Sequence, residues 1–142
     1  MMEAKESKFF SEFEVRTHKH SQLVSISELI EKEIQKMGWT DGLLHVFVPH
    51  TTAAVIIQED ADPDVQKDIL YVLDKMIPWE DSTYQHTEGN TAAHVKSALL
   101  GNSLHCNVIG ARLKLGTWQG VFLCEFDGPR IRKIQLSFMP IG

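Results

Sequence analysis

Residues 43–57 read LLHVFVPHTTAAVII, which is two apolar runs joined by a short polar corner. The first run, 43–48, is rich in the branched and aromatic side chains that favour strands, and Pro49 ends it. The second run, 53–57, has the same character. We therefore expect two strands here, arranged as a hairpin or as one bent strand, with the corner His50-Thr51-Thr52 between them.

Three helices are expected, one before this stretch and two after it. The first follows Ser27, its predicted cap, and ends at Gly38, since glycine is favoured just past a helix C-terminus. The second starts with Asp62 as cap and Pro63 as its first residue. A shorter helix covers residues 91–100. The helices therefore cluster in the middle of the chain.

Strand signals dominate both ends of the chain. Apolar and charged residues alternate over 9–16, as in a strand with one wet face. Later apolar runs separated by glycines predict strands at 104–109, 112–115, 121–126 and 131–138. Because strands and helices are segregated, we expect the α+β class. The predicted fold is one compact domain over residues 1–142, with a mostly antiparallel sheet, partly barrel- or sandwich-like, and about three helices.

Composition limits the function classes. The chain has 142 residues, 43% hydrophobic and 23% charged, which is typical of a globular domain. Its formal net charge of -5 argues against nonspecific nucleic-acid binding, which needs a basic face. Near the amino terminus there is no long apolar run, so we expect no membrane segment and a cytoplasmic location. Cys106 and Cys124 lie in apolar runs and are expected to be buried free thiols.

Several familiar sites are excluded by their motifs. No glycine-rich dinucleotide fingerprint and no phosphate-binding P-loop occurs. The acidic run 59–64 is not an EF-hand calcium loop, because Val65 and Tyr71 stand where glycine and glutamate are required. Helix capping explains Asp62, whereas Glu59 and Asp60 stay available for a site.

Three histidines stand where the chain leaves or enters regular structure: His50, His86 and His94. Neutral imidazoles bind zinc, and three of them leave one coordination position open for water or substrate. We therefore predict that these three share a site for a divalent metal, zinc in the first place, or for an anion. The remaining histidines are expected to be structural: His18, His20, His45 and His105.

Further polar residues lie near these histidines in the sequence. The predicted catalytic groups are Glu88, as a general base or as an acceptor for an imidazole N–H, together with Glu59 and Arg112. The predicted substrate-binding residues are Thr51, Thr52, Asn90, Lys96, Trp118, Gln119, Glu125 and Arg130.

Some of these residues have a structural alternative. Trp118 lies in a glycine-bracketed turn, 116–120, that suits ring stacking, but a tryptophan in a core or an interface is equally compatible. Lys96 binds phosphate or simply faces water. Glu125 joins the site or forms an ion pair with Arg112, Arg130 or Arg132.

Seven short motifs stand in one order along nearly the whole chain. They are Pro49-His50-Thr51-Thr52-Ala53-Ala54, Glu59 with Asp62-Pro63, Tyr84-Gln85-His86 with Glu88-Gly89, Ala93-His94-Val95-Lys96, Leu115-Gly116-Thr117-Trp118-Gln119-Gly120, Glu125, and Arg130-Ile131-Arg132. As a set they resemble the YjbQ-like family, to which the label secondary thiamine-phosphate synthase is attached. The resemblance implies a compact α+β domain that assembles as a homotrimer. The segment between Glu88 and His94 departs slightly from the family pattern, so the resemblance does not define the role of Asn90.

Two classes of function follow. The first is a small enzyme acting on a phosphorylated heteroaromatic, and the resemblance points to thiamine-phosphate formation, in which a thiazole nitrogen displaces pyrophosphate. Metal-assisted hydrolysis with Glu88 as base is a variant of this hypothesis. The second is a trimeric module that binds a ligand or metal without turnover. The number of candidate acid, base and electrophilic groups favours the enzyme.

Overall fold

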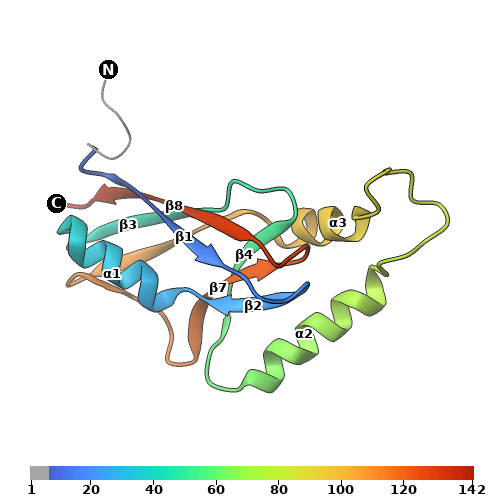
Figure 1. Cartoon of the computed structure of the whole chain (residues 1–142). Helices are drawn as coiled ribbons and strands as arrows, with labels where there is room; N and C mark the ends of the chain where they lie inside the picture. Colours follow the sequence, from blue (N-terminus) through green and yellow to red (C-terminus); the bar gives the residue numbers. More distant parts are fainter. Residues whose placement is uncertain (1–6) are drawn as a thin grey trace.

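The computed structural model describes residues 7–142, which form two antiparallel sheets and three helices (Figure 1). The larger sheet has the strand order β1-β8-β3-β5-β6 and the smaller one the order β2-β7-β4. The strands are β1 (Phe10–Arg16), β2 (Gln22–Ser25), β3 (Gly42–Phe47), β4 (Ala53–Glu59), β5 (Ser103–Ile109), β6 (Arg112–Leu113), β7 (Gln119–Glu125) and β8 (Ile131–Pro140). The helices are α1 (Ser27–Met37), α2 (Pro63–Met76) and α3 (Thr91–Leu100). The expected α+β class is confirmed.

The two strands around the polar corner belong to different sheets. β3 pairs with β5 and β8, whereas β4 pairs with β7. The expectation of a hairpin or a single bent strand is therefore wrong. Pro49 cannot donate to a ladder, and the corner 49–52 carries the chain from one sheet to the other. Both runs find their partners in the last third of the chain.

The helix ends follow local chemistry, with one exception. Gly38 ends α1 with a positive φ of 72°, and the Asp62 carboxylate accepts a hydrogen bond from the N–H of Asp64 at the start of α2. Ser27 is not the cap of α1. It is the first helical residue, and its hydroxyl accepts a hydrogen bond from the Val121 N–H at 2.8 Å. The short strand β2 was not expected from the sequence.

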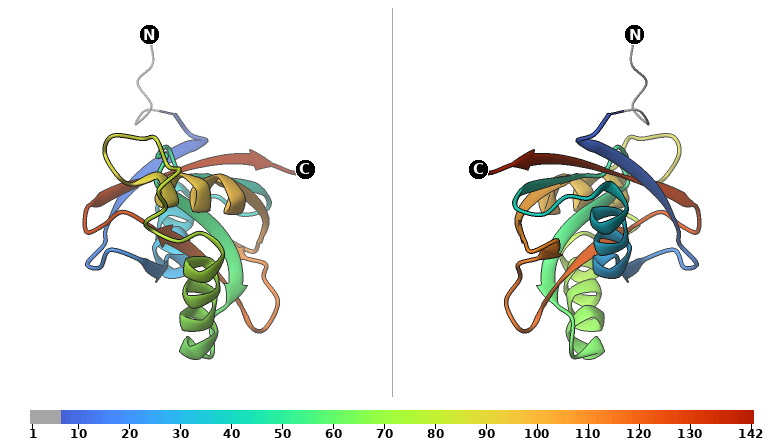
Figure 2. Two further views of the ribbon diagram at one scale, coloured as in Figure 1. Left: turned by 90° about the vertical axis from the view of Figure 1, so that its right-hand side faces the viewer. Right: turned by 90° about the vertical axis from the view of Figure 1, so that its left-hand side faces the viewer.

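Strand β7 lies between two hydrophobic cores. Val121 and Leu123 face the core shared with the larger sheet and α1, whereas Phe122 and Cys124 face the core shared with α2 and α3. In Figures 1 and 2, α2 and α3 lie together at one end of the molecule and α1 at the other. The smaller sheet is thus the middle layer, and its edge strand β4 is covered by α3.

Both cysteines are buried free thiols, as expected. Burial raises the pKa of Cys106 to about 11 and that of Cys124 to about 12, so both are protonated at neutral pH and unreactive. None of the helices within residues 7–142 is long and apolar enough to cross a membrane.

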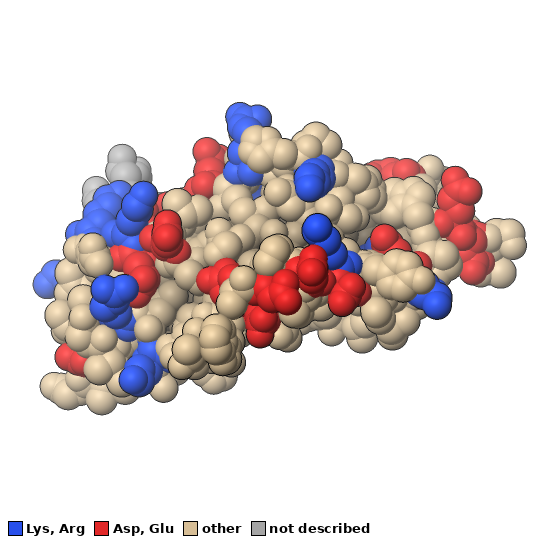
Figure 3. All heavy atoms as spheres, turned by 90° about the horizontal axis from the view of Figure 1, so that it is seen from below, with Lys and Arg blue, Asp and Glu red and all other residues tan. Residues whose placement is uncertain are grey.

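Acidic side chains gather in a band across the middle of the face drawn in Figure 3, with most of the basic side chains around it. This face therefore offers no continuous basic surface to a phosphate backbone.

Candidate functional site

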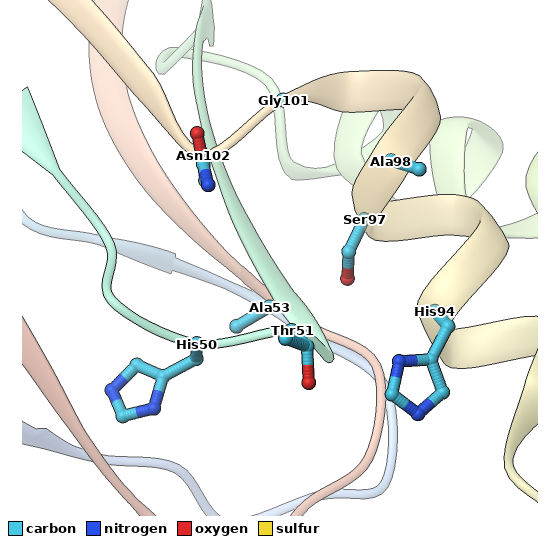
Figure 4. A pocket seen from close by; sticks show the side chains of 8 residues that line it. All are labelled: His50, Thr51, Ala53, His94, Ser97, Ala98, Gly101 and Asn102. Atoms are coloured by element: carbon cyan, nitrogen blue, oxygen red, sulfur yellow. The ribbon is translucent and has the colours of Figure 1, made fainter.

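A pocket of about 340 Å³ opens where the corner between β3 and β4 meets α3 (Figure 4). The residues that line it come from two parts of the chain: His50, Thr51 and Ala53 from the corner and β4, and His94, Ser97, Ala98, Gly101 and Asn102 from α3 and the turn that follows it. Among these lining residues none carries a carboxylate. The polar lining thus consists of imidazoles, hydroxyls and an amide.

Small side chains and backbone hydrogen bonds hold these segments together. Ala93 of α3 and Ala54 of β4 are fully buried in the same core, which lets the helix lie close to the strand. The carbonyl of Gly101 accepts from the Val55 N–H at 3.1 Å, and that of Asn102 accepts from the Val48 N–H at 2.8 Å. The turn after α3 is therefore tied to the chain on both sides of the corner.

A buried ion pair lies behind the corner. Arg132 is 2% exposed and Glu125 is 0% exposed, and the Arg132 guanidinium binds both carboxylate oxygens, with Nε 2.8 Å from Oε1. The same guanidinium donates to the Thr52 hydroxyl at 2.9 Å and to the Thr52 carbonyl at 3.1 Å. Thr17 and the Asp127 N–H donate to the remaining lone pairs of Glu125. Glu125 and Thr52 thus support the pocket from behind without lining it.

The Glu125 carboxylate is stabilised in its charged form. Burial acts to raise its pKa, but hydrogen bonds from Arg132, the Asp127 N–H and Thr17, with the Arg132 charge, outweigh burial and hold the pKa below its usual value. Glycine at position 128 is required beside this network, because a Cβ there would lie 2.4 Å from the carbonyl oxygen of Lys19. The hydrogen bonds of Arg132 to Glu125 and Thr52 therefore hold the corner in place.

Acid should weaken the fold through Glu125. A carboxyl with a lowered folded pKa contributes its full stabilisation above its ordinary value of 4.5 and loses it as the pH falls through the folded value. We expect Glu125→Gln to unfold at a lower temperature than wild type at about pH 7, and this difference to shrink towards about pH 3. Thermal unfolding of both proteins across this range provides the measurement. A constant difference would show that the Glu125 charge does not carry the effect.

His50 has a fixed hydrogen-bond partner outside the pocket. Its Nε2 accepts from the Lys133 N–H at 2.8 Å. Burial lowers the pKa of His50, and the charges of Arg132, Arg130 and Lys133 lower it further, against an opposing contribution from Glu125. His50 is therefore neutral at physiological pH. Each of these three cations is paired with a carboxylate, Arg132 with Glu125, Arg130 with Asp127 and Lys133 with Glu12, so the surroundings of His50 carry little net charge.

His86 and His94 lie side by side, with ring centroids 5.3 Å apart and planes at 83°. They line a second cavity of about 250 Å³ together with Thr91. In the described part of the chain, Thr91 Oγ1 and Asn90 Oδ1 are buried without a hydrogen-bond partner. The start of α3 thus borders a second, mostly apolar cavity, which shares His94 with the first.

The three histidines do not converge on one point. The ring of His50 lies on the other side of Thr51 from the ring of His94 (Figure 4). Among residues 7–142, no three His, Cys, Asp or Glu side chains are placed to hold a metal ion together. The side chains of one chain therefore do not fit the expected three-histidine zinc site. His50 and His94 line the same pocket from opposite sides of Thr51, and only the rings of His86 and His94 lie side by side.

Lys96 is buried rather than solvated. Its side chain is 3% exposed, forms an ion pair with Asp74 of α2, and has Nζ 5.6 Å from the centre of the Phe126 ring. The alternative that Lys96 simply faces water is wrong. Its charge joins α3 to α2.

Asn90 and Arg130 meet at Asp127 instead of facing the pocket. The Asp127 carboxylate accepts from Asn90 Nδ2 and from Arg130 Nη2, each at 2.9 Å. Arg130 Nε also donates to the Asp127 carbonyl at 2.7 Å. Both side chains therefore brace the turn between β7 and β8.

The glycine-bracketed turn lies at the opposite end of the smaller sheet. Glu59 pairs with Gln119 there, whereas Ala53 pairs with Glu125 at the pocket end of the same ladder. Trp118 is 64% exposed and contributes its carbonyl to the Asp60 N–H. The structure does not bring Glu59, Trp118 or Gln119 to the pocket within one chain.

Two further predicted residues also lie elsewhere. Arg112 is on the edge strand β6, where its Nε is 3.5 Å from Glu31 Oε2 of α1. Glu88 is exposed in the loop between α2 and α3 and lines neither cavity. The general base predicted from the sequence is therefore not placed against the pocket in this structure.

Sequence reasoning missed two polar residues that line the pocket, Ser97 and Asn102, and the Lys133 N–H that binds His50 outside it. Ser97 follows His94 by one helical turn, so helix periodicity alone would have placed the two on one face. Asn102 lines the pocket only because backbone hydrogen bonds attach the turn after α3 to the chain on both sides of the corner. The Lys133 N–H has no side-chain signature and could not have been found from residue type.

Comparison with known proteins agrees with this fold. The family model described as UPF0047 protein YjbQ-like matches residues 11–141. The UPF0047 protein YugU of Bacillus subtilis is 46% identical over 126 residues, which cover 89% of this chain and 96% of YugU. The UPF0047 protein MJ1081 of Methanocaldococcus jannaschii is 39% identical over 132 residues, covering 93% and 95%.

Solved structures give the same result. A YjbQ/UPF0047 family protein of Clostridium acetobutylicum superposes with a TM-score of 0.87 at 44% identity, covering 91% of this chain and 99% of that one. The conserved hypothetical protein TT1486 of Thermus thermophilus has a TM-score of 0.86 at 40% identity, with the same coverage. From its sequence and its fold alike, the chain belongs to the YjbQ-like UPF0047 family.

Proposed function

We propose that the protein is an enzyme that acts on a phosphorylated small molecule held in the pocket between the corner and α3. The observation that carries this proposal is the polar lining of that pocket, which combines His50, Thr51, His94 and Asn102 without a carboxylate. Their N–H and O–H groups can donate hydrogen bonds to anionic oxygens.

An anion suits this lining better than zinc. A metal cation needs several lone pairs aimed at one point, and carboxylates often supply part of the set. The pocket instead offers neutral donors dispersed along its wall, which suit the several oxygens of a phosphate. The expected zinc ion therefore stays a prediction.

A phosphorylated heteroaromatic is the substrate class that we propose. Most of the pocket surface is apolar, and the small residues Ala53, Ala98 and Gly101 leave room there for a flat ring next to a phosphate. In a pyrophosphate displacement, negative charge builds up on the leaving group. Donors fixed around that charge lower the barrier, and we assign to His94 the proton that the leaving pyrophosphate takes up.

Turnover tests this function. The purified protein, mixed with the pyrimidine pyrophosphate and the thiazole phosphate precursors of thiamine phosphate, should release pyrophosphate faster than the mixture without protein. His94→Ala should lower this rate about a hundredfold if His94 transfers a proton. His105→Ala, on β5 of the larger sheet, should keep the wild-type rate. Equal rates for the two variants would place the chemistry elsewhere. Tight binding of either precursor with no turnover would favour the non-catalytic module.

A further inference from the structure

The hydrogen bond between His50 and β8 decides which ring nitrogen of the imidazole carries the proton. A backbone N–H can only donate, so the Lys133 N–H requires a lone pair on His50 Nε2, 2.8 Å away. A neutral imidazole with its lone pair on Nε2 carries its proton on Nδ1. An imidazolium would set two donors against each other at this contact. Nδ1–H is therefore the group that His50 has free for a ligand.

The sheet explains why His50 takes this position. Phe47 pairs with Gln135 in the β3–β8 ladder, so continuing the register by two residues would set Pro49 opposite Lys133. The chain turns away at this proline, and the Lys133 N–H meets the His50 ring instead of a strand carbonyl. His50 thus closes the end of the ladder.

The neighbouring ion pair keeps the ring in this place. Arg132, which precedes Lys133, is held by Glu125 and donates to both Thr52 oxygens. Both sides of the corner are therefore attached to the same two residues of β8. A change of tautomer would break the contact with Lys133 and leave that N–H facing another donor.

We infer that His50 serves the pocket as a fixed Nδ1–H donor, and that the ligand atom beside it is a hydrogen-bond acceptor such as a phosphate oxygen. This inference rests on the proposed binding of a phosphorylated ligand in the same pocket. It separates His50 from the roles of metal ligand and general base, since both need a free lone pair and the one lone pair of the neutral ring already accepts from the Lys133 N–H.

Three substitutions distinguish the roles of the two ring nitrogens of His50. His50→Asn places an amide near the position of Nδ1 and keeps a donor for the ligand, whereas His50→Gln places the amide near Nε2 and keeps an acceptor for Lys133. His50→Ala removes both. With pyrophosphate as the calorimetric probe, we expect the Asn variant to bind within about threefold of wild type and the Gln and Ala variants to lose about tenfold or more. Wild-type affinity in the Gln variant together with a loss in the Asn variant would overturn the inference.

The nitrogen shifts of the imidazole provide a readout that needs no ligand. In the free wild-type protein, ¹⁵N NMR should show His50 Nδ1 protonated and Nε2 unprotonated, and a chelator should leave both shifts and the pyrophosphate affinity unchanged. A proton on Nε2, or an affinity that depends on added zinc, would refute the donor role. If wild type binds no pyrophosphate, the proposed function fails, while the tautomer measurement still decides the state of His50.

Discussion

Replacing Arg132 with alanine should destabilise the protein by about 3–5 kcal/mol, because Glu125 would remain as an unpaired buried charge. Both side chains are almost fully buried, and the guanidinium supplies the hydrogen bonds that keep the carboxylate ionised. The corner would also lose both bonds to Thr52. Chemical denaturation followed by circular dichroism measures the free energy of unfolding.

Arg130→Ala is the matched control for this substitution. Its side chain is 50% exposed and pairs with Asp127, so its loss should cost about 1 kcal/mol or less. If Arg132→Ala does not fold, the double variant Glu125→Leu/Arg132→Met removes both charges and should recover much of the stability. Equal effects of Arg130→Ala and Arg132→Ala, or a double variant no better than Arg132→Ala, would contradict the assigned role of the ion pair.

His94→Ala should weaken pyrophosphate binding by about tenfold to a hundredfold, as expected for one hydrogen bond to a charged ligand of about 1.5–3 kcal/mol. His94 lines both the main pocket and the smaller cavity beside His86, so its ring is common to the two spaces. Isothermal titration calorimetry gives the affinity of wild type and variant.

His105→Ala controls for the loss of a histidine as such. His105 is exposed on β5 and pairs with His45 in the larger sheet, outside both cavities. Its removal should leave pyrophosphate binding unchanged. If His94→Ala bound pyrophosphate as tightly as His105→Ala, the ligand would not lie against α3.

Helix ends could be predicted because their signals are local. A cap or a breaker acts within a few residues, as Asp62 and Gly38 do here. Strand partners could not be predicted in the same way, since β3 and β4 pair with segments from the last third of the chain. Adjacent apolar runs look alike whether they pair with each other or with distant strands.

The same limit applies to the site. His50 and His94 line one pocket because α3 packs on β4, which the sequence could not show. Trp118 is as prominent in sequence, yet a strand of seven residues separates its turn from the pocket. In sequence, Lys96 looks like a solvent-exposed lysine on a helix, whereas in the fold it is buried and pairs with Asp74 of α2. Residue types therefore suggested the chemistry, and only the fold could select the neighbours.

Binding of a phosphate group in the pocket between the corner and α3 can be tested by titrating the ¹⁵N-labelled protein with pyrophosphate and following its backbone amide signals. We expect saturable shifts at residues 50–53 and 94–102 and none at the turn 116–120. Saturable shifts at that turn with an unperturbed corner, or no saturable shift anywhere, would contradict it.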